Sequence, residues 1–351
     1  MNGVATCAMF VASRPLCATF FLNIAHFWFS IFFEPIYRVG SYILPRLPKT
    51  RAAIIRHVAR DSSLIFVARY IVGPLSWLCW SARYRRVLRA RTGPNSLTTW
   101  LELRGTPRAP PAVLIIYIHG GGFGSHTATE FAFAGEVLPR LASKGVAARV
   151  LALDYSLAPQ ASRAKQQAQL MAAYQQATGS FALDRVVLAG DSAGGHHALA
   201  LFLELLDFGP RFPDALIAIS PWLNLAPLSE RPGDYMPPKL VKKFIAAAAH
   251  SESFLWPPTN FLSRLADGQH CRHCPPTLVA VGGAELFRDE GRALARALQE
   301  SPACDDCVLV DVPKGVHDCF FLPFFDPVPG AAALGLDGIA AFVLAQCQPR
   351  A

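Results

Sequence analysis

Charged residues are scarce in this sequence, and several common binding motifs are absent from it. Asp, Glu, Lys and Arg make up 17% of its 351 residues, against 52% for the hydrophobic types. The net charge is +8, but no zinc-finger, RNA-recognition or basic-zipper pattern occurs, which argues against a nucleic-acid partner. No Asn-x-Ser/Thr sequon occurs either, so glycosylation cannot report on which side of a membrane the chain lies.

The charged and the hydrophobic residues are unevenly distributed. Residues 16–33 form a Phe-rich run of 18 residues without a charge, which is long enough to cross a bilayer. Residues 35–110 then carry 14 Lys and Arg against two acidic residues, and such a stretch suits anionic lipid headgroups. We therefore expect a membrane surface or bilayer as a partner of both segments. The alternative is an apolar helix packed on the folded domain.

The N-terminal quarter is predicted to divide into two parts. Residues 1–40 form an apolar, membrane-associated helical segment, and residues 41–96 a basic, amphipathic helical linker or cap. Within the linker, the apolar residues 63–80 are interrupted by Arg69, Gly73 and Pro74, so a helix in the membrane interface fits better than a second span. Residues 81–91 supply five arginines for contacts with headgroups.

From residue 97 onward, short apolar runs alternate with longer helical ones. Repeated strand-then-helix units with apolar strands predict an α/β fold with a mostly parallel central sheet, flanked by helices on both faces. Residues 224–263 interrupt the alternation, so an insertion there would cap the strand ends of a domain spanning 97–351. The predicted strands are 97–104, 113–118, 148–154, 185–189, 215–220, 277–281 and 307–312, and the predicted helices are 130–144, 161–178, 198–208, 291–299 and 330–346.

A candidate nucleophile lies in the turn between one of these strands and the following helix. Gly190, Ser192 and Gly194 have the spacing Gly-x-Ser-x-Gly, which holds a serine on a sharp bend above the sheet. Each glycine is expected where a Cβ would collide with neighbouring backbone. The new helix points its free N–H groups at the same place. The alternative is an ordinary glycine-rich turn.

A second glycine-rich loop, His119-Gly120-Gly121-Gly122, follows a buried strand. It lacks the Lys-Ser/Thr of a phosphate-binding P-loop and the spacing of a dinucleotide site. An oxyanion hole fits better, because glycine lets backbone N–H groups approach a developing negative oxygen. Gly121, Gly122 and Ala193 are the expected donors. His119 and Gly120 are expected to fix the loop.

A nucleophilic serine needs a base, and the base needs an orienting carboxylate. His317 lies in the loop after the last predicted strand, where it would reach over the sheet edge. Glu285 is the first carboxylate after the preceding strand and is the expected acid. Asp289 is the second candidate, because it is expected at the start of a helix, where acidic residues are favoured by the helix dipole. The order Ser192, Glu285, His317 is that of the α/β-hydrolase fold.

Five motifs in order make the chain similar to the hormone-sensitive-lipase branch of that fold, which includes arylacetamide deacetylases, bacterial carboxylesterases and fungal steryl acetate hydrolases. They are His119–Phe123, Asp154–Pro159, Gly190–Gly195, Ser220–Trp222 and Gly315–Phe320. The resemblance covers about residues 97–345. It implies Ser192 as nucleophile, His317 as base, an acid at the position of Glu285, and the same three oxyanion donors. Family members usually have Asp where Glu285 stands, and Arg where Ser156 stands.

The resemblance and the residues together predict a serine ester hydrolase that needs no cofactor and no metal. The expected substrate is a small lipophilic ester, steryl, aryl or from secondary metabolism, which loses its acetyl group. Phe123 and Phe320 are expected to contact it. The expected location is the endoplasmic reticulum membrane, with the side left open. The alternatives are a non-catalytic ligand receptor on the same scaffold, and an amidase or acyltransferase that uses the same triad.

Nine cysteines include two Cys-x-x-Cys pairs, Cys271 with Cys274 and Cys304 with Cys307. Their spacing fits a four-thiolate zinc site. Because both pairs precede strands expected to be parallel neighbours, disulfides across that edge are an alternative in an oxidising compartment. Free thiols in loops are the third possibility, and the sequence leaves the three open.

Overall fold

The computed structural model describes the folded domain but not the N-terminal quarter. The predicted membrane segment 16–33, the whole of 1–40 and most of 41–96 lie outside the described residues, as does most of the predicted insertion 224–263. No helix in the described part is long and apolar enough to span a bilayer. The described residues are 83–106, 111–127, 131–180, 185–208, 211–223, 234, 236, 241–242, 244–246, 273–304, 306–321, 328 and 330–347.

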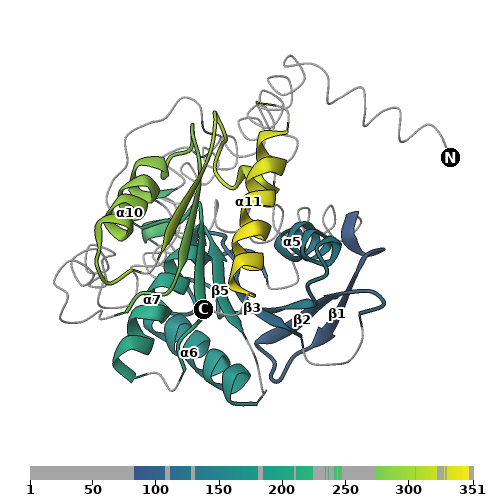
Figure 1. Cartoon of the computed structure of the whole chain (residues 1–351). Coiled ribbons are helices and arrows are strands. Elements are labelled where there is room, and N and C mark those ends of the chain that lie inside the picture. Colours follow the sequence, from purple (N-terminus) through teal and green to yellow (C-terminus); the bar gives the residue numbers. More distant parts are fainter. Residues whose placement is uncertain are drawn as a thin grey trace, which may run out of the picture.

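Within these residues the chain forms an eight-stranded sheet in the order β1-β2-β4-β3-β5-β6-β7-β8 (Figure 1). The six strands β4-β3-β5-β6-β7-β8 pair in parallel. At one side of the sheet, β2 pairs antiparallel with both β4 and β1. This confirms the predicted α/β class with a mostly parallel sheet. The strands are β1 Leu88–Thr92, β2 Thr98–Leu103, β3 Val113–Ile118, β4 Ala148–Leu153, β5 Val186–Asp191, β6 Ala215–Ile219, β7 Thr277–Gly282 and β8 Cys307–Val312.

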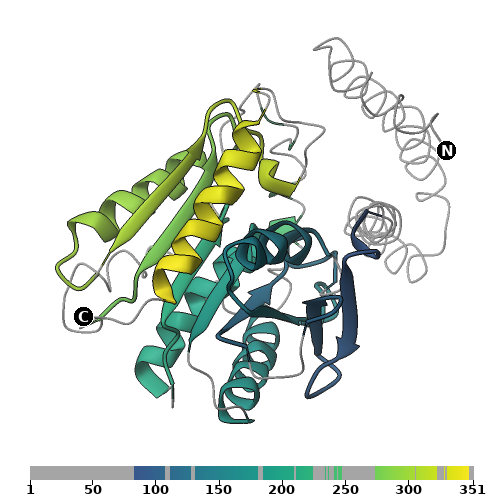
Figure 2. The same cartoon turned by 45° about the vertical axis from the view of Figure 1, so that its right-hand side comes forward.

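Helices cover both faces of the sheet (Figures 1 and 2). On β3, Val113, Ile115 and Tyr117 join one core with α5 and α11, while the alternate residues join a second core with α6, α7 and α10. Every residue of β3 is therefore buried, which explains its unbroken apolar sequence. The helices are α5 Ala132–Ser143, α6 Arg163–Ser180, α7 Ala193–Phe208, α10 Arg288–Glu300 and α11 Ala331–Gln346.

The edge strand β1 corrects one prediction. Residues 88–92 were assigned to a helical linker whose arginines contact lipid headgroups, but they form a strand of the sheet. Arg89 donates to the buried carboxylate of Glu102 at 2.6 Å and Arg91 at 2.8 Å, and the guanidinium of Arg149 lies 3.2 Å from the same carboxylate. Burial disfavours the charged carboxylate, but the arginines outweigh it and lower the pKa of Glu102. These arginines are therefore tied to the fold.

Parallel pairing brings the loops that carry the candidate residues to one edge of the sheet. The chain leaves β3, β5, β7 and β8 at their carboxyl ends, which lie side by side because these strands run in the same direction. Ligand sites of open α/β sheets form at this edge. The loops after these strands carry the glycine-rich segment, Ser192, Glu285 and His317.

Candidate active site

Ser192 lies on a strained turn between β5 and α7. Its φ is +52°, a left-handed conformation that costs free energy for a residue with a side chain. A Cβ at Gly190 would overlap the backbone of Gly194, and one at Gly194 would overlap the carbonyl of Ile118. The turn therefore closes only with glycine at both positions. The Ser192 N–H donates to the carbonyl of Ile219 on β6 at 2.8 Å, which fixes the turn to the sheet.

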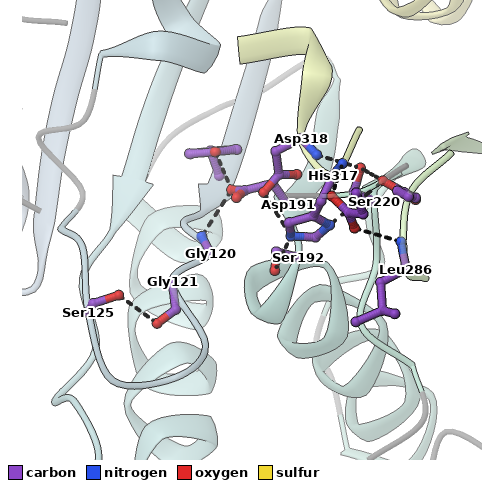
Figure 3. Close-up of polar contacts among 12 residues, drawn as sticks. Gly120, Gly121, Ser125, Asp191, Ser192, Ser220, Leu286, His317 and Asp318 are labelled. Carbon is purple, nitrogen blue, oxygen red and sulfur yellow. Dashed lines mark hydrogen bonds and ion pairs between the residues drawn. The ribbon is translucent and has the colours of Figure 1, made fainter. Parts of the chain in front are cut away.

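The structure brings His317 directly to Ser192 (Figure 3). The distance between His317 Nε2 and Ser192 Oγ is 2.9 Å, although the two residues are 125 positions apart. Both residues are almost completely buried, with exposed fractions of 3% and 5%. A ring nitrogen at this distance can take the hydroxyl proton.

Glu285 approaches the other ring nitrogen of His317. Its Oε2 lies 3.7 Å from His317 Nδ1, which is within ion-pair range but longer than a hydrogen bond. The hydroxyl of Ser220 donates to the same oxygen at 2.6 Å, and Oε1 has no hydrogen-bond partner among the described residues. Burial raises the pKa of Glu285 to about 7, against the lowering effects of His317 and Ser220. Asp289, the reserve acid, instead pairs with Arg288 at the start of α10.

A second carboxylate, that of Asp318, lies next to the His317 ring. Asp318 Oδ2 lies 3.1 Å from His317 Nε2, the same nitrogen that contacts Ser192. Burial alone favours a neutral imidazole, but Asp318 and Glu285 outweigh it and raise the pKa of His317 well above its ordinary value. Asp191 is buried nearby, and burial together with the charge of Asp318 raises its pKa to about 7.

The glycine-rich loop lies beside this cluster (Figure 3). Gly121 and Gly122 have φ values of +95° and +61°, which glycine adopts without strain. The Gly120 N–H donates to Asp191 at 2.9 Å, and the Ser125 hydroxyl donates to the Gly121 carbonyl at 2.8 Å. The loop is thus held on both sides of the predicted donors, and the third donor, Ala193, is the buried first residue of α7.

The His119 ring contacts Tyr155, Gly120 and Asp154. Its ring stacks on Tyr155 with centroids 4.5 Å apart, and its Nδ1 lies 2.9 Å from the Gly120 carbonyl oxygen. Its Nε2 lies 3.4 Å from Asp154. These contacts fix the loop, and none of them involves Ser192 or His317.

The two phenylalanines predicted to contact substrate lie in different places. Phe123 is buried beside the turn of Ser192, in an apolar cluster with Ala193 and Trp222. Phe320 belongs to the core, where its ring packs so closely on Gly335 of α11 that a Cβ there would overlap it. Phe320 therefore packs in the core between the sheet and α11, and its contact with substrate stays a prediction. The apolar cluster consists of Phe123, Ala158, Ala193, Trp222, Val241, Phe244, Leu286 and Phe287.

The cysteine pairs are only partly described. Cys274 and Cys304 are neighbours in an isolated parallel β-bridge beside β7 and β8. Burial raises the pKa of Cys307 to about 12, so its thiol is protonated at neutral pH. No group of three metal-ligating side chains occurs in the described ranges. Cys271 lies outside them, so the four-thiolate hypothesis stays a prediction.

Three polar residues of the site were not assigned from the sequence. Ser220 donates to Glu285 and also accepts from the Asp318 N–H at 3.1 Å. Asp318 contacts the His317 ring. Asp234 accepts from the backbone N–H of Leu286, after β7, and from that of His317, after β8. Ser220 belongs to the motif Ser220–Trp222, and Asp318 follows His317. The sequence therefore places both residues near the site but does not predict their contacts. Asp234 has no local signal.

Comparison with known proteins identifies the family. A model of the alpha/beta hydrolase fold family matches residues 115–321, which is more than half of the chain. Among solved structures, an esterase from the bacterial hormone-sensitive lipase family superposes with a TM-score of 0.65 at 22% identity. That alignment covers 79% of this chain and 91% of the esterase, and it shows the shared fold.

Curated relatives match over shorter parts. Hormone-sensitive lipase of Bos taurus is 34% identical over 134 residues, which cover 37% of this chain and 17% of that protein. Carboxylesterase/phospholipase LipF of Mycobacterium tuberculosis is 31% identical over 234 residues, covering 60% and 58%. An acetyl-hydrolase of Streptomyces hygroscopicus is 30% identical over 186 residues, covering 52% and 60%. The chain thus spans less than two thirds of the length of each.

Proposed function

The chain belongs to the alpha/beta hydrolase fold family, in the branch that resembles hormone-sensitive lipase, and from this premise we propose that it hydrolyses carboxylic esters through an acyl-enzyme on Ser192. The observation that carries the proposal is the 2.9 Å contact between His317 Nε2 and Ser192 Oγ. The esterases among its relatives support the same reaction class.

In the first half of the reaction, Ser192 Oγ attacks the ester carbonyl carbon as its proton passes to His317 Nε2. Glu285 stabilises the imidazolium from the side of Nδ1. The carbonyl oxygen becomes negative, and the amides of Gly121, Gly122 and Ala193 are the donors that stabilise it. Collapse of the tetrahedral intermediate breaks the bond to the alcohol oxygen, which receives the proton from His317.

The second half repeats these steps with water. His317 takes a proton from a water molecule, whose oxygen attacks the acyl carbon on Ser192. The second tetrahedral intermediate releases the carboxylic acid, and the proton returns to Ser192 Oγ. The same three amide donors act in both halves, because the negative charge develops on the same carbonyl oxygen in each tetrahedral intermediate.

Ser192→Ala tests this proposal. Hydrolysis of short-chain nitrophenyl esters and labelling by a fluorophosphonate probe should both be lost, while the melting temperature stays close to that of the wild type. Ser143→Ala is the matched control, since its hydroxyl donates to the Arg140 carbonyl on α5 and takes no part in the site. A wild-type protein without esterase activity would favour a ligand receptor, and labelling that persists in Ser192→Ala would refute the assignment.

We also propose that the substrate combines a short acyl group, acetyl above all, with a lipophilic alcohol. Phe244 supports the short acyl group, because its ring packs against Gly122 at the predicted oxyanion site. Trp222 and Phe287, stacked with centroids 5.4 Å apart, continue the apolar surface beside the nucleophile. The name of the acetyl-hydrolase relative agrees with this proposal.

A panel of esters tests the substrate class. The value of kcat/KM should be highest for acetate and fall as the acyl chain lengthens, and steryl or aryl acetates should be hydrolysed better than small alkyl acetates. Phe244→Ala should raise the ratio of octanoate to acetate hydrolysis. A ratio that stays unchanged in Phe244→Ala would contradict a limit set by this ring.

The membrane association stays a proposal supported by the sequence alone. We propose that residues 16–33 and the basic residues beyond them attach the enzyme to the endoplasmic reticulum, apart from the arginines of β1 that bind Glu102. Fractionation of cells expressing the full chain and a version lacking residues 1–40 tests this attachment. Equal release of both versions into the soluble fraction would contradict it.

A further inference from the structure

Asp234 links the two loops that carry the acid and the base. It lies in the predicted insertion, far in sequence from both loops. Its Oδ2 accepts from the backbone N–H of Leu286 at 2.7 Å, and its Oδ1 accepts from the backbone N–H of His317 at 3.2 Å. One carboxylate therefore joins the residue next to Glu285 to the base itself.

The two loops are also joined by backbone hydrogen bonds. The Ala284 N–H donates to the Gly315 carbonyl at 2.8 Å, and the Gly283 N–H donates to the Val312 carbonyl at 2.7 Å. Neither bond includes the backbone N–H of Leu286 or of His317.

Glu285 and His317 follow different strands, β7 and β8, and their side chains are 3.7 Å apart at the closest pair of nitrogen and oxygen. Ser220, which follows β6, forms a further link, between the Glu285 carboxylate and the Asp318 N–H. Ser220 thus contacts the side chain of one loop and the backbone of the other, whereas Asp234 accepts from the backbone of both loops.

The position of those backbones decides whether the triad works. A shift of about 1 Å between reacting groups can cost roughly 100-fold in rate. The contact between Glu285 and His317 is already long, so a further separation would weaken the stabilisation of the imidazolium. Bonds from a charged carboxylate to N–H groups are stronger than those between neutral groups.

We propose that Asp234 is a positioning residue, which sets the separation of Glu285 and His317 through the backbone of both loops. The proposal rests on the proposed esterase function. It predicts that loss of the Asp234 carboxylate lowers kcat and changes KM little, because the loops shift while the oxyanion donors and the apolar cluster stay in place.

Two variants of the full-length protein test the proposal with a nitrophenyl acetate. Asp234→Ala removes both acceptors, and kcat should fall by roughly 10- to 100-fold with KM changed less than about threefold. Asp234→Asn keeps one oxygen acceptor, so it should recover part of this loss, with kcat about fivefold below the wild type. The rate of fluorophosphonate labelling should fall in the same order.

Asp214→Ala is the matched control. Asp214 also accepts from a backbone N–H, that of Val186 at 2.8 Å. It precedes β6, so it lies at the amino ends of the parallel strands, opposite the candidate site at their carboxyl ends. Removing it should lower the melting temperature and leave kcat per folded molecule within about twofold. A merely structural Asp234 would behave in the same way.

The outcomes separate the two proposals. If the wild type neither hydrolyses the ester nor reacts with the fluorophosphonate, the esterase function fails. If the wild type is active and Asp234→Ala keeps kcat within twofold per folded molecule, only the positioning role fails. Should Asp234→Ala not fold, Asp234→Asn decides, since wild-type kcat in that variant also overturns the proposal.

Discussion

Two buried glutamates in this molecule have opposite surroundings. Glu102 on β2 and Glu285 after β7 are both fully buried, with exposed fractions of 0%. Three arginines surround Glu102, and its pKa is lowered even though burial alone would raise it. Glu285 has a single serine donor and a histidine at 3.7 Å, and its pKa is raised to about 7.

The difference distinguishes a carboxylate that serves the fold from one available for chemistry. Glu102 is saturated with strong donors, so its charge is fixed and joins β1 to the sheet. Glu285 keeps an oxygen without a hydrogen-bond partner in the described structure, and its charge is stabilised chiefly when His317 is also charged. Incomplete satisfaction costs stability, but it lets the carboxylate respond to a proton on the imidazole.

The largest expected effect comes from Glu285→Gln. The amide cannot stabilise the imidazolium, so kcat should fall by roughly 1,000- to 10,000-fold. Stability should change little or rise, because a buried neutral amide costs less than a poorly satisfied carboxylate. Steady-state kinetics and thermal unfolding measure both quantities. A kcat within tenfold of the wild type would remove Glu285 from the triad.

Glu102→Gln should give the reverse pattern. Losing the charge leaves three guanidinium groups without their shared carboxylate, and because two of them reach solvent the expected loss of unfolding free energy is about 1–3 kcal/mol. The kcat per folded molecule should match the wild type, since two strands, β4 and β3, separate β2 from β5. Denaturant unfolding checks the stability. Reduced kcat with unchanged stability would break the contrast between the two glutamates.

The sequence predicted the parts of the site that depend on local structure. Gly190 and Gly194 report a turn that only glycine can close, and the order of strands places Ser192, Glu285 and His317 at one edge. The strands β2 to β8 agree with the predicted ones within a few residues, because apolar runs of strand length are strong local signals.

Features that depend on tertiary contacts were missed. The strand β1 carries Arg89 and Arg91, and its role is visible only once Glu102 is seen opposite them. Asp234 and Ser220 are short polar residues whose partners lie tens of positions away. The sequence shows that Phe320 is apolar, but not that its ring packs on Gly335 of α11. Such contacts have no local sequence signal.

Asp318→Asn sharpens the comparison on the side of the base. The Asp318 carboxylate raises the pKa of His317, and a charged imidazole cannot take a proton from Ser192. Because removal of this charge lowers the pKa of His317, the acid limb of the kcat/KM profile should move to lower pH. Activity below neutral pH should then rise relative to the wild type. Profiles that coincide would show that Asp318 does not control the base.

Asp289→Asn should have the smallest effect. Asp289 lies in the first turn of α10, its side chain is 57% exposed, and it pairs with Arg288 at 2.9 Å. An exposed pair of this kind contributes at most about 1 kcal/mol, so both kcat and melting temperature should stay near the wild-type values. Kinetics beside Glu285→Gln decide between the two candidate acids. A large loss of kcat in Asp289→Asn, with kcat kept in Glu285→Gln, would make Asp289 the acid of the triad. Glu285 would then be a structural carboxylate, like Glu102.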